Sequence, residues 1–280
     1  MSARTGPRAR AAAVIVASLA PGSALRAQLA PTAPAATPTA MPARERSLEA
    51  GGYAHGVSDG YGSWSGAYLR ATQAIGARTQ LAADLLTQRA FGDAGRYVGL
   101  SVRHALSART FVVVAGGTGT GRFALPQTRA DLLVGHAFGA RRPLVLALGA
   151  GWVDAQARYE DRAGVAQLAW YASPTTIAEV SARANVSRPG DVRSLRVAPA
   201  LTRLLNGGRQ ALTLRADVGT EGYQLLAGPV PIARDFRSEL LSATLRHRAT
   251  ARWGASLQGE GYHNPYYTRA GVRAGILRFW

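Results

Sequence analysis

Arginine and carboxylate side chains recur at alternate positions through much of the chain, interleaved with Gly, Ser and Thr. In an extended segment, side chains two residues apart point to the same face, so these charges would share one face of a sheet. Unpaired buried charge is costly, so we expect cross-strand ion pairs on that face, for example Glu179 or Arg183 with Arg196. The residues predicted to line this inner face are Glu49, Arg70, Asp84, Arg103, Arg129, Asp131, Glu179, Arg183, Arg196, Arg215, Asp217, Arg246, Glu260 and Arg273.

Two functions fit a charged inner face of this kind. One is a polar channel whose arginines favour anionic or sugar-like solutes. The other is a plugged lumen in which the charges neutralise one another and the protein has a structural or surface-binding role. About fourteen strands would enclose more space than side chains can fill, but less than the open porins enclose.

The histidines do not form a catalytic or metal-binding pattern. His104, His136 and His247 fall at outward positions near tight turns, where interfacial side chains are expected. His55 and His263 lie near the loop ends of the first and last strands, which could bring them together with Tyr266 and Tyr267. A metal site would need a third ligand, and none is evident. We therefore expect no metal and no cofactor.

Nucleophilic catalysis is also poorly supported by the sequence. The chain has no Gly-x-Ser-x-Gly motif. Ser101 and His104 alternate onto opposite faces of one segment, and Ser238 and His247 are too far apart along another. We predict no catalytic residues and a non-enzymatic protein, with a membrane hydrolase as the less favoured alternative.

Aromatic residues gather where two segments meet their connecting loops. They are Tyr61, Trp64, Tyr266 and Tyr267, which lie beside Asp59 and Asn264. Together they could form a surface on which sugars stack. The favoured interpretation is an aromatic girdle at the membrane interface.

The segments that must position these residues alternate with period two from about residue 46 onward. Val98, Leu100 and Val102 alternate with Ser101 and Arg103, for example. A soluble sandwich would also alternate, but here one face is Ala, Leu and Val, and the other mixes charges with Gly and Ser, as in a barrel facing lipid and a polar lumen. The predicted strands are 46–55, 64–75, 79–90, 95–106, 109–117, 127–138, 143–154, 164–172, 175–186, 192–204, 209–219, 236–248, 251–262 and 266–280.

This count predicts an antiparallel, up-and-down transmembrane β-barrel of about fourteen strands, with twelve or sixteen as alternatives. The breaks alternate between tight turns and more varied loops, including 117–126, 156–163 and 219–235. The last loop is long enough to fold inward as a plug. An even number of strands places both chain ends on the periplasmic side. Pro199 falls inside the tenth segment, where it would remove a ladder hydrogen bond.

The N-terminal region indicates export. Three arginines precede the short apolar run AAAVIVASLA, and small residues follow, which is the order of a secretory signal peptide. We predict a signal peptide over 1–27, with cleavage after Ala24 or Ala27. The Pro- and Ala-rich stretch 28–45 is predicted to be a disordered linker, and the barrel to span 46–280.

The net charge of +17 comes from 33 arginines against 16 acids, without any lysine. The arginines are scattered singly rather than in blocks, which argues against nucleic acid as a partner. The absence of cysteine excludes disulfides, cysteine-ligated metals and a lipoprotein anchor.

The chain ends in a pattern similar to that of outer-membrane barrels, which usually close on an aromatic residue preceded by apolar residues at alternate positions. Val272, Ala274, Ile276 and Trp280 fit this terminal signature, whereas Arg278 departs from it. At the rim, Arg278 would cost little; at the middle of the bilayer it would cost about 2–4 kcal/mol. Barrel-assembly machinery is the partner expected for this strand.

Several short motifs resemble the YaiO family of outer-membrane barrels. They are Tyr61-Gly62-Ser63-Trp64 followed by Tyr68-Leu69-Arg70, Gly76 with Thr79, Arg89-Ala90-Phe91-Gly92 with Tyr97 beyond, and Leu125-Pro126. The resemblance spans most of 47–280 and implies an outer-membrane barrel without established catalysis. Some relatives lie near polysaccharide synthesis or export machinery. We therefore expect a channel or accessory for polysaccharide or small anionic solutes, in contact with outer-membrane lipid and lipopolysaccharide.

Overall fold

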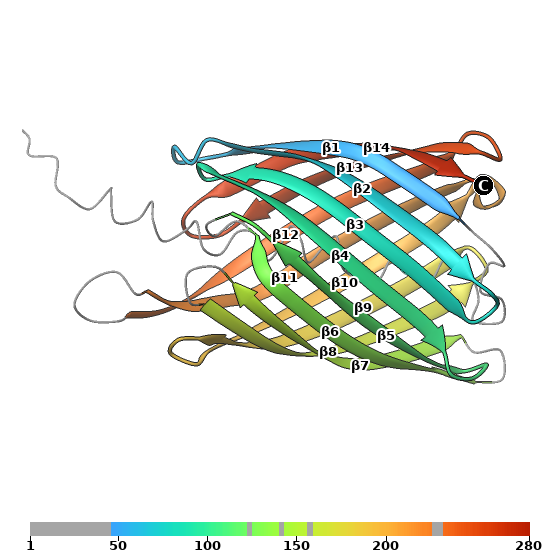
Figure 1. Ribbon diagram of the computed structural model, residues 1–280, viewed down its shortest axis with the longest axis horizontal. Helices are drawn as coiled ribbons and strands as arrows, with labels where there is room; N and C mark the ends of the chain where they lie inside the picture. Colours follow the sequence, from blue (N-terminus) through green and yellow to red (C-terminus); the bar gives the residue numbers. More distant parts are fainter. Residues whose placement is uncertain (1–45, 122–124, 140–142, 156–158, 226–231) are drawn as a thin grey trace, which may run out of the picture.

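A computed structural model of the chain describes residues 46–121, 125–139, 143–155, 159–225 and 232–280. These residues form a closed antiparallel barrel of fourteen strands, in which sequential neighbours pair and β1 pairs with β14 (Figure 1). The predicted fold class is confirmed. The predicted signal peptide (1–27) and linker (28–45) lie outside the described residues. Among the residues that are described, no helix is long and apolar enough to cross a membrane.

The strand positions follow the predicted segments closely along most of the chain. The strands are β1 (Ser47–Val57), β2 (Ser63–Ile75), β3 (Thr79–Ala90), β4 (Asp93–Ala105), β5 (Thr110–Gly119), β6 (Pro126–Phe138), β7 (Leu144–Ala155), β8 (Tyr159–Ser173), β9 (Thr176–Arg188), β10 (Val192–Leu205), β11 (Gln210–Leu225), β12 (Ile232–Arg248), β13 (Trp253–His263) and β14 (Thr268–Phe279). A short 3-10 turn, η1 (Asn206–Gly208), joins β10 to β11.

The period-two alternation sorts side chains between the two faces of the wall. Leu100 on β4 points outward and is 65 % exposed in the isolated barrel, whereas Tyr97 on the same strand points inward and is 3 % exposed. Lipid covers the outward apolar band of a transmembrane barrel, so outward leucines and valines such as Leu100 are not exposed to water in the membrane. The polar residues are left on the inner face.

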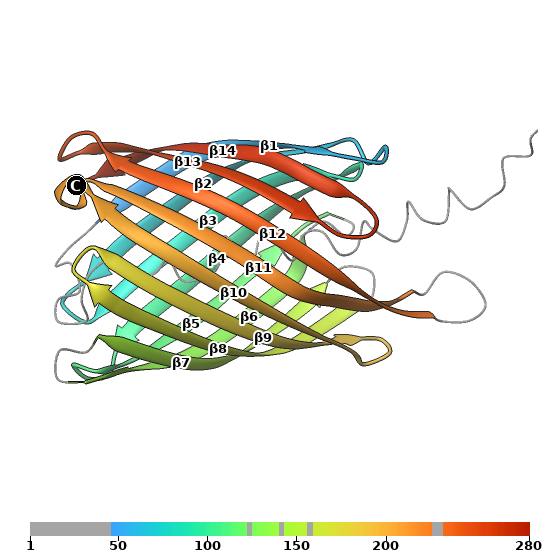
Figure 2. The same cartoon turned by 180° about the vertical axis from the view of Figure 1, so that it is seen from behind.

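The two ends of the barrel differ, and we name them by what they carry. The terminal rim is where β1 begins and β14 ends, since Ser47 pairs with Phe279. The loop rim is the opposite end, where β1 turns into β2. At the loop rim the β11–β12 hairpin extends beyond its neighbours (Figure 2).

Two of the predicted long loops are largely strand. β11 continues to Leu225 and β12 starts at Ile232, so the described parts of the predicted loop 219–235 belong to strands rather than to an inward-folding plug, and residues 226–231 lie outside the described residues. β8 likewise starts at Tyr159 rather than at residue 164. The glycines and prolines there suggest a loop, but the hairpins pair their backbones in continuous register.

Pro199 lies within β10, as the sequence places it. It is registered with Val180 of β9, whereas the pairing of β10 with β11 skips Ala198 and Pro199 and resumes at Ala200. Because proline has no N–H, the ladder is interrupted on one side only. The barrel therefore accommodates Pro199 without a change of register.

Glycines on the inner wall make room for tyrosine rings. A Cβ atom at Gly66 would lie 2.5 Å from the Tyr53 hydroxyl, and one at Gly51 would lie 2.6 Å from the Tyr68 hydroxyl. Both distances are too short for non-bonded atoms. A side chain at either position would therefore push the tyrosine ring away from the wall. These tyrosines lie against the wall beside the polar residues described next.

Candidate functional site

All fourteen residues predicted to line the lumen occupy inward positions of their strands. On each strand they share the alternation of the buried inner residues, such as Tyr53 of β1, Leu86 of β3 and Tyr97 of β4. Eight of them are arginines and six are carboxylates. Their partners decide what this inner wall can do.

Four of the predicted residues form two close pairs with each other. Arg70 Nε donates to Asp84 Oδ1 at 2.6 Å across the β2–β3 pair. Arg129 binds the carboxylate of Asp131 on the same strand through Nε and through Nη2, the latter at 3.1 Å. These pairs keep their charge close to neutral.

Other inner arginines are held against aromatic rings. The Arg103 guanidinium lies 3.9 Å from the Phe111 ring centroid, and that of Arg273 lies 3.8 Å from the Tyr68 ring centroid. Such contacts orient an arginine without cancelling its charge.

Glu49 collects three partners near the terminal rim. Ser256 and Tyr68 donate to its Oε1 at 2.6 and 2.9 Å, and Arg246 Nη2 lies 3.8 Å from its Oε2. The Arg246 side chain remains 44 % exposed, although it points into the barrel. It is therefore a solvent-accessible cation on the inner wall.

Arg196 does not pair with Glu179 or Arg183, so that prediction is wrong. Arg183 is the register partner of Arg196 across β9 and β10, and Glu179 lies opposite Ala200. Two guanidiniums facing each other repel, and Arg196 instead turns toward β11. Arg215, another arginine predicted to line the lumen, lies on β11 opposite Ser242 of β12.

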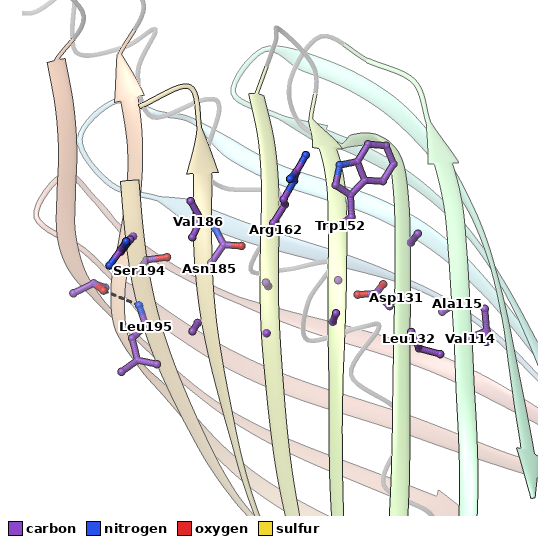
Figure 3. Close-up of a pocket in the computed structure, with 18 residues that line it drawn as sticks. Val114, Ala115, Asp131, Leu132, Trp152, Arg162, Asn185, Val186, Ser194 and Leu195 are labelled. Atoms are coloured by element: carbon purple, nitrogen blue, oxygen red, sulfur yellow. Dashed lines mark hydrogen bonds between the residues drawn. The ribbon is translucent and has the colours of Figure 1, made fainter. Parts of the chain in front are cut away.

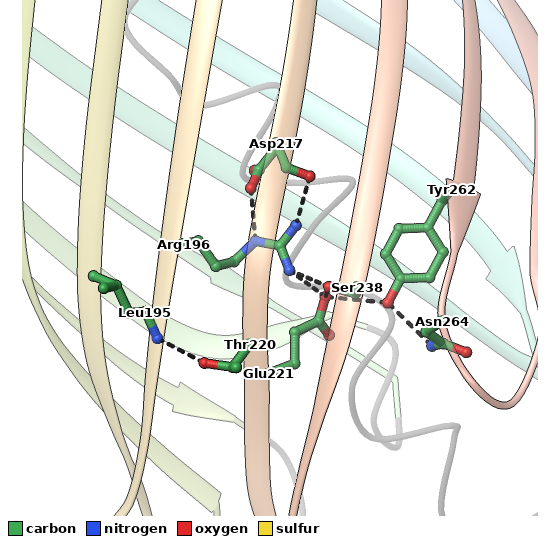
Figure 4. A network of polar contacts seen from close by, with 8 residues as sticks. All are labelled: Leu195, Arg196, Asp217, Thr220, Glu221, Ser238, Tyr262 and Asn264. Carbon is green, nitrogen blue, oxygen red and sulfur yellow. Dashed lines mark hydrogen bonds and ion pairs between the residues drawn. The ribbon is translucent and has the colours of Figure 1, made fainter.

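Arg196 is the centre of the most connected polar network in the described part of the barrel (Figure 4). Its Nε lies 2.8 Å from Asp217 Oδ1, and its Nη1 lies 2.7 Å from Glu221 Oε1 and also contacts the Ser238 hydroxyl. Ser238 donates to Glu221 at 2.7 Å. The arginine side chain is buried, yet it has two carboxylate partners.

The network continues along the inner wall through Tyr262 of β13. Its hydroxyl donates to Glu221 at 3.1 Å, and its ring lies 5.2 Å from the guanidinium of Arg269. Arg269 Nη2 binds Glu260 at 2.8 Å, and His55 Nε2 lies 3.3 Å from the same Glu260 oxygen. We call this set the lumenal belt; its members, from β10 to β1, are Arg196, Asp217, Glu221, Ser238, Tyr262, Arg269, Glu260 and His55.

The predicted aromatic girdle is wrong for Trp64 and Tyr267. Trp64 is completely buried on the inner side of β2, 4.8 Å from the ring of Phe91 and 6.4 Å from that of Tyr267. Tyr61 packs on Phe91 and Tyr267 as well. Burial raises the pKa of the Tyr267 hydroxyl far above its ordinary value, so this phenol stays neutral. These four residues form an aromatic cluster inside the loop rim.

Tyr266 takes a separate place at the same rim. Its ring packs edge-on against Phe236 of β12, with the centroids 5.2 Å apart. Neither Trp64 nor Tyr267 has the exposed ring face that sugar stacking would need.

The histidines do not come together. His55 is buried inside the wall, whereas His263 points outward and contacts Thr268 at 3.1 Å. His104, His136 and His247 are outward on their strands, and each contacts a residue of the neighbouring strand, namely Thr79, Thr110 and Gln210. Within the described residues, no three histidine or acidic side chains are grouped to hold a metal ion.

The terminal signature lies on the outer face of the barrel. Val272, Ala274 and Ile276 point outward along β14, and Trp280 follows the strand at the terminal rim. Arg278 also lies at this rim, where its guanidinium is 4.7 Å from the Trp253 ring centroid. Its position is the one at which an arginine costs little.

Sequence reasoning missed Arg269, Glu221 and Ser238. Arg269 shares the alternation of Arg273 in the same predicted strand, and this signal was available. Glu221 was assigned to a loop because glycines flank it. Ser238 lay in a predicted strand, but nothing in the sequence marks a serine as a partner of a distant arginine.

The belt and the adjoining aromatic cluster contain polar atoms without a hydrogen-bond partner among the described residues. Arg269 is 1 % exposed, and its Nε and Nη1 find no hydrogen-bond acceptor among the described residues. The same holds for Trp64 Nε1 and His55 Nδ1. The guanidinium lies 4.3 Å from the Trp64 ring centroid, so its charge is stabilised by Glu260 and by the ring faces.

The sequence matches one known family of membrane barrels. Residues 45–224 match the profile of the YaiO membrane beta barrel domain, which is well over half of the chain. No curated protein matches the sequence.

Solved outer-membrane barrels share the fold at low sequence identity. The CymD monoaromatic hydrocarbon channel is 8 % identical, with a TM-score of 0.55 over 85 % of this chain and 88 % of its own. Outer-membrane expressed OmpT of Vibrio cholerae is 9 % identical, with a TM-score of 0.49 over 85 % of this chain and 97 % of its own. These likenesses concern the fold alone.

Proposed function

This chain belongs to the family of the YaiO membrane beta barrel domain, and we propose that within the outer membrane it acts as a non-enzymatic channel for small polar, preferentially anionic solutes. The observation that carries the proposal is the inner wall. Arginines outnumber carboxylates among its charged residues, and some of those arginines remain accessible to solvent, as Arg246 does.

Inner arginines outside the lumenal belt give this channel its selectivity. Carboxylates neutralise Arg196 and Arg269, so these two hold the wall together rather than attract solute. Arg103 instead lies over the Phe111 ring, and its charge can act on solutes in the lumen. A field of fixed positive charge raises the local concentration of anions.

Passage of envelope polysaccharide, as an accessory to its export, is the extended form of this proposal. Sugar chains would need the same polar wall and an aqueous path past the aromatic cluster. The C-terminal strand is proposed to engage the barrel-assembly machinery through its outward apolar residues and Trp280.

Conductance across a planar bilayer tests the channel. We expect wild-type barrels to conduct and to prefer chloride over potassium. Arg246→Glu should lower the chloride preference about two-fold at 0.1 M salt, because reversing one charge about 10 Å from the path changes an ion's energy by a few tenths of a kcal/mol after screening. The shift should fade at 1 M salt, where the Debye length falls to about 3 Å.

The matched control is Arg203→Glu. Arg203 points outward on β10 near the terminal rim, so the same charge change on the lipid side should leave selectivity unaltered. Equal shifts for both variants would mean that the lumen does not set selectivity. Folded barrels without conductance at any voltage would contradict the channel.

A structural or surface-binding barrel with a closed lumen is the second candidate. Its supporting observation is the aromatic cluster, which packs on the inner side of the wall at the loop rim against the buried Arg269. Absence of conductance together with full stability would favour it. A membrane hydrolase is the third, and turnover of phospholipid or lipid A by the purified barrel would favour it over both.

A further inference from the structure

A shallow groove of about 1150 Å³ lies on the outward face of the wall between β5 and β11, near the loop rim (Figure 3). Its floor and sides follow one row of directly paired outward residues across five strands. From β6 to β10, this row reads Leu132, Ala150, Gly164, Ala184 and Leu195. Large side chains stand at its two ends and small ones between them, so the surface is hollowed in the middle.

The groove ends where two strands separate. β10 and β11 are paired up to Arg196 and Gly219, and beyond that point Leu195 N donates to the Thr220 hydroxyl at 3.0 Å. From Thr220 onward, β11 pairs with β12 alone. Thr220 thus forms one edge of the groove.

Arginines border the groove on the side of the loop rim. The next row of paired outward residues reads Trp152, Arg162, Val186 and Arg193. Figure 3 shows Trp152 and Arg162 nearer to the connecting loops than Leu132. Arg162 and Arg193 are two strands apart, which is about 10 Å at the usual strand spacing.

The charges at this border are partly balanced. Glu160 pairs with Arg162, and Asp191 pairs with the outward Arg188 at 3.0 Å. Arg193 is exposed and has no ion pair with any described residue. Arg193 is therefore free to bind an anion. Arg162 can bind the same anion while it remains paired with Glu160.

We propose that this groove binds lipopolysaccharide of the outer leaflet, with its acyl chains between Leu132 and Leu195 and a phosphate on Arg193 and Arg162. Arginine binds phosphate through two parallel hydrogen bonds. The groove spans about 19 Å across the strands, which is wider than one acyl chain and suits a lipid with several. With the chain ends on the periplasmic side, the loop rim lies in the outer leaflet.

Binding of defined lipids to the purified barrel in detergent, followed by native mass spectrometry, tests this site. We expect bisphosphorylated lipid A to bind at least about ten-fold more tightly than its dephosphorylated form, since hydrogen bonds to charged groups are the strong ones. The double variant Arg162→Gln with Arg193→Gln should lose that ten-fold difference. Arg96→Gln, an outward arginine on β4 away from the groove, should keep it.

A second variant addresses the groove itself. A Cβ at Gly164 would meet no atom within 4 Å, so Gly164→Leu fills the groove without a clash in the wall. It should weaken lipid A binding while the barrel keeps its heat-modifiable gel migration.

Three results would overturn the assignment: equal binding of both lipid A forms, unchanged binding by the double variant, or equally tight binding of phosphatidylglycerol. Lipid binding is measured apart from conductance, so a closed lumen would leave this test intact.

Discussion

Replacing Arg196 with alanine is expected to lower the free energy of unfolding by about 3–5 kcal/mol, because it leaves two partly buried carboxylates without their buried cation. Asp217 and Glu221 both lose a charged partner within 2.8 Å. The Ser238 hydroxyl loses its contact with Arg196 Nη1. Unfolding in urea, followed by the band shift between folded and unfolded barrel on a gel, measures the loss.

The control variant is Arg193→Ala, three residues away on the same strand. Arg193 points outward and has no ion pair in the described structure, so its removal should change stability in lipid-free detergent by less than about 0.5 kcal/mol. Arg196→Lys should fall between the two, because an ammonium keeps the charge but cannot contact all three partners as the planar guanidinium does. Equal losses for Arg193→Ala and Arg196→Ala would refute the network as a stabilising element.

Period two was enough to predict the strands and the face on which each side chain lies. One face of the wall meets lipid and the other a polar lumen, and a shift by one residue would exchange them, so the pattern is strongly constrained. Arg70 and Asp84 were placed inward from this alternation alone, and they meet across β2 and β3. The predicted strand ends differ most from the structure where the β11–β12 and β7–β8 hairpins continue past glycines, so that Glu221 lies in a strand rather than in a loop.

The contacts that the inward side chains make with one another could not be predicted in the same way. Alternation says that Arg183 and Arg196 point inward, but only the register of β9 on β10 shows that these like charges face each other. The inner position of Trp64, in contrast, follows from the alternation. Trp64 shares the face of Arg70 in the same predicted strand, and the girdle was inferred from residue type alone.

The inner position of Trp64 predicts a large effect of its removal. Trp64→Ala should cost about 3–5 kcal/mol of stability, the usual range for deleting a fully buried large aromatic side chain. Phe91 and Tyr267 would lose their packing partner, and Arg269 would lose the ring face beneath its guanidinium. In planar bilayers, the same variant should conduct more than the wild type, because the space it vacates lies on the inner side of the loop rim.

Trp170→Ala is the matched control. Trp170 of β8 points outward and is 53 % exposed in the isolated barrel, as a tryptophan facing the membrane should be. Its removal should cost less than about 1 kcal/mol and leave conductance unchanged, since it touches neither the belt nor the aromatic cluster. If Trp64→Ala were as mild as Trp170→Ala, Trp64 would face the membrane after all, and the cluster could not restrict the lumen. If Trp64→Ala lost stability but gained no conductance, the loop rim would be closed by residues other than the cluster, which is the outcome that the structural-barrel alternative requires.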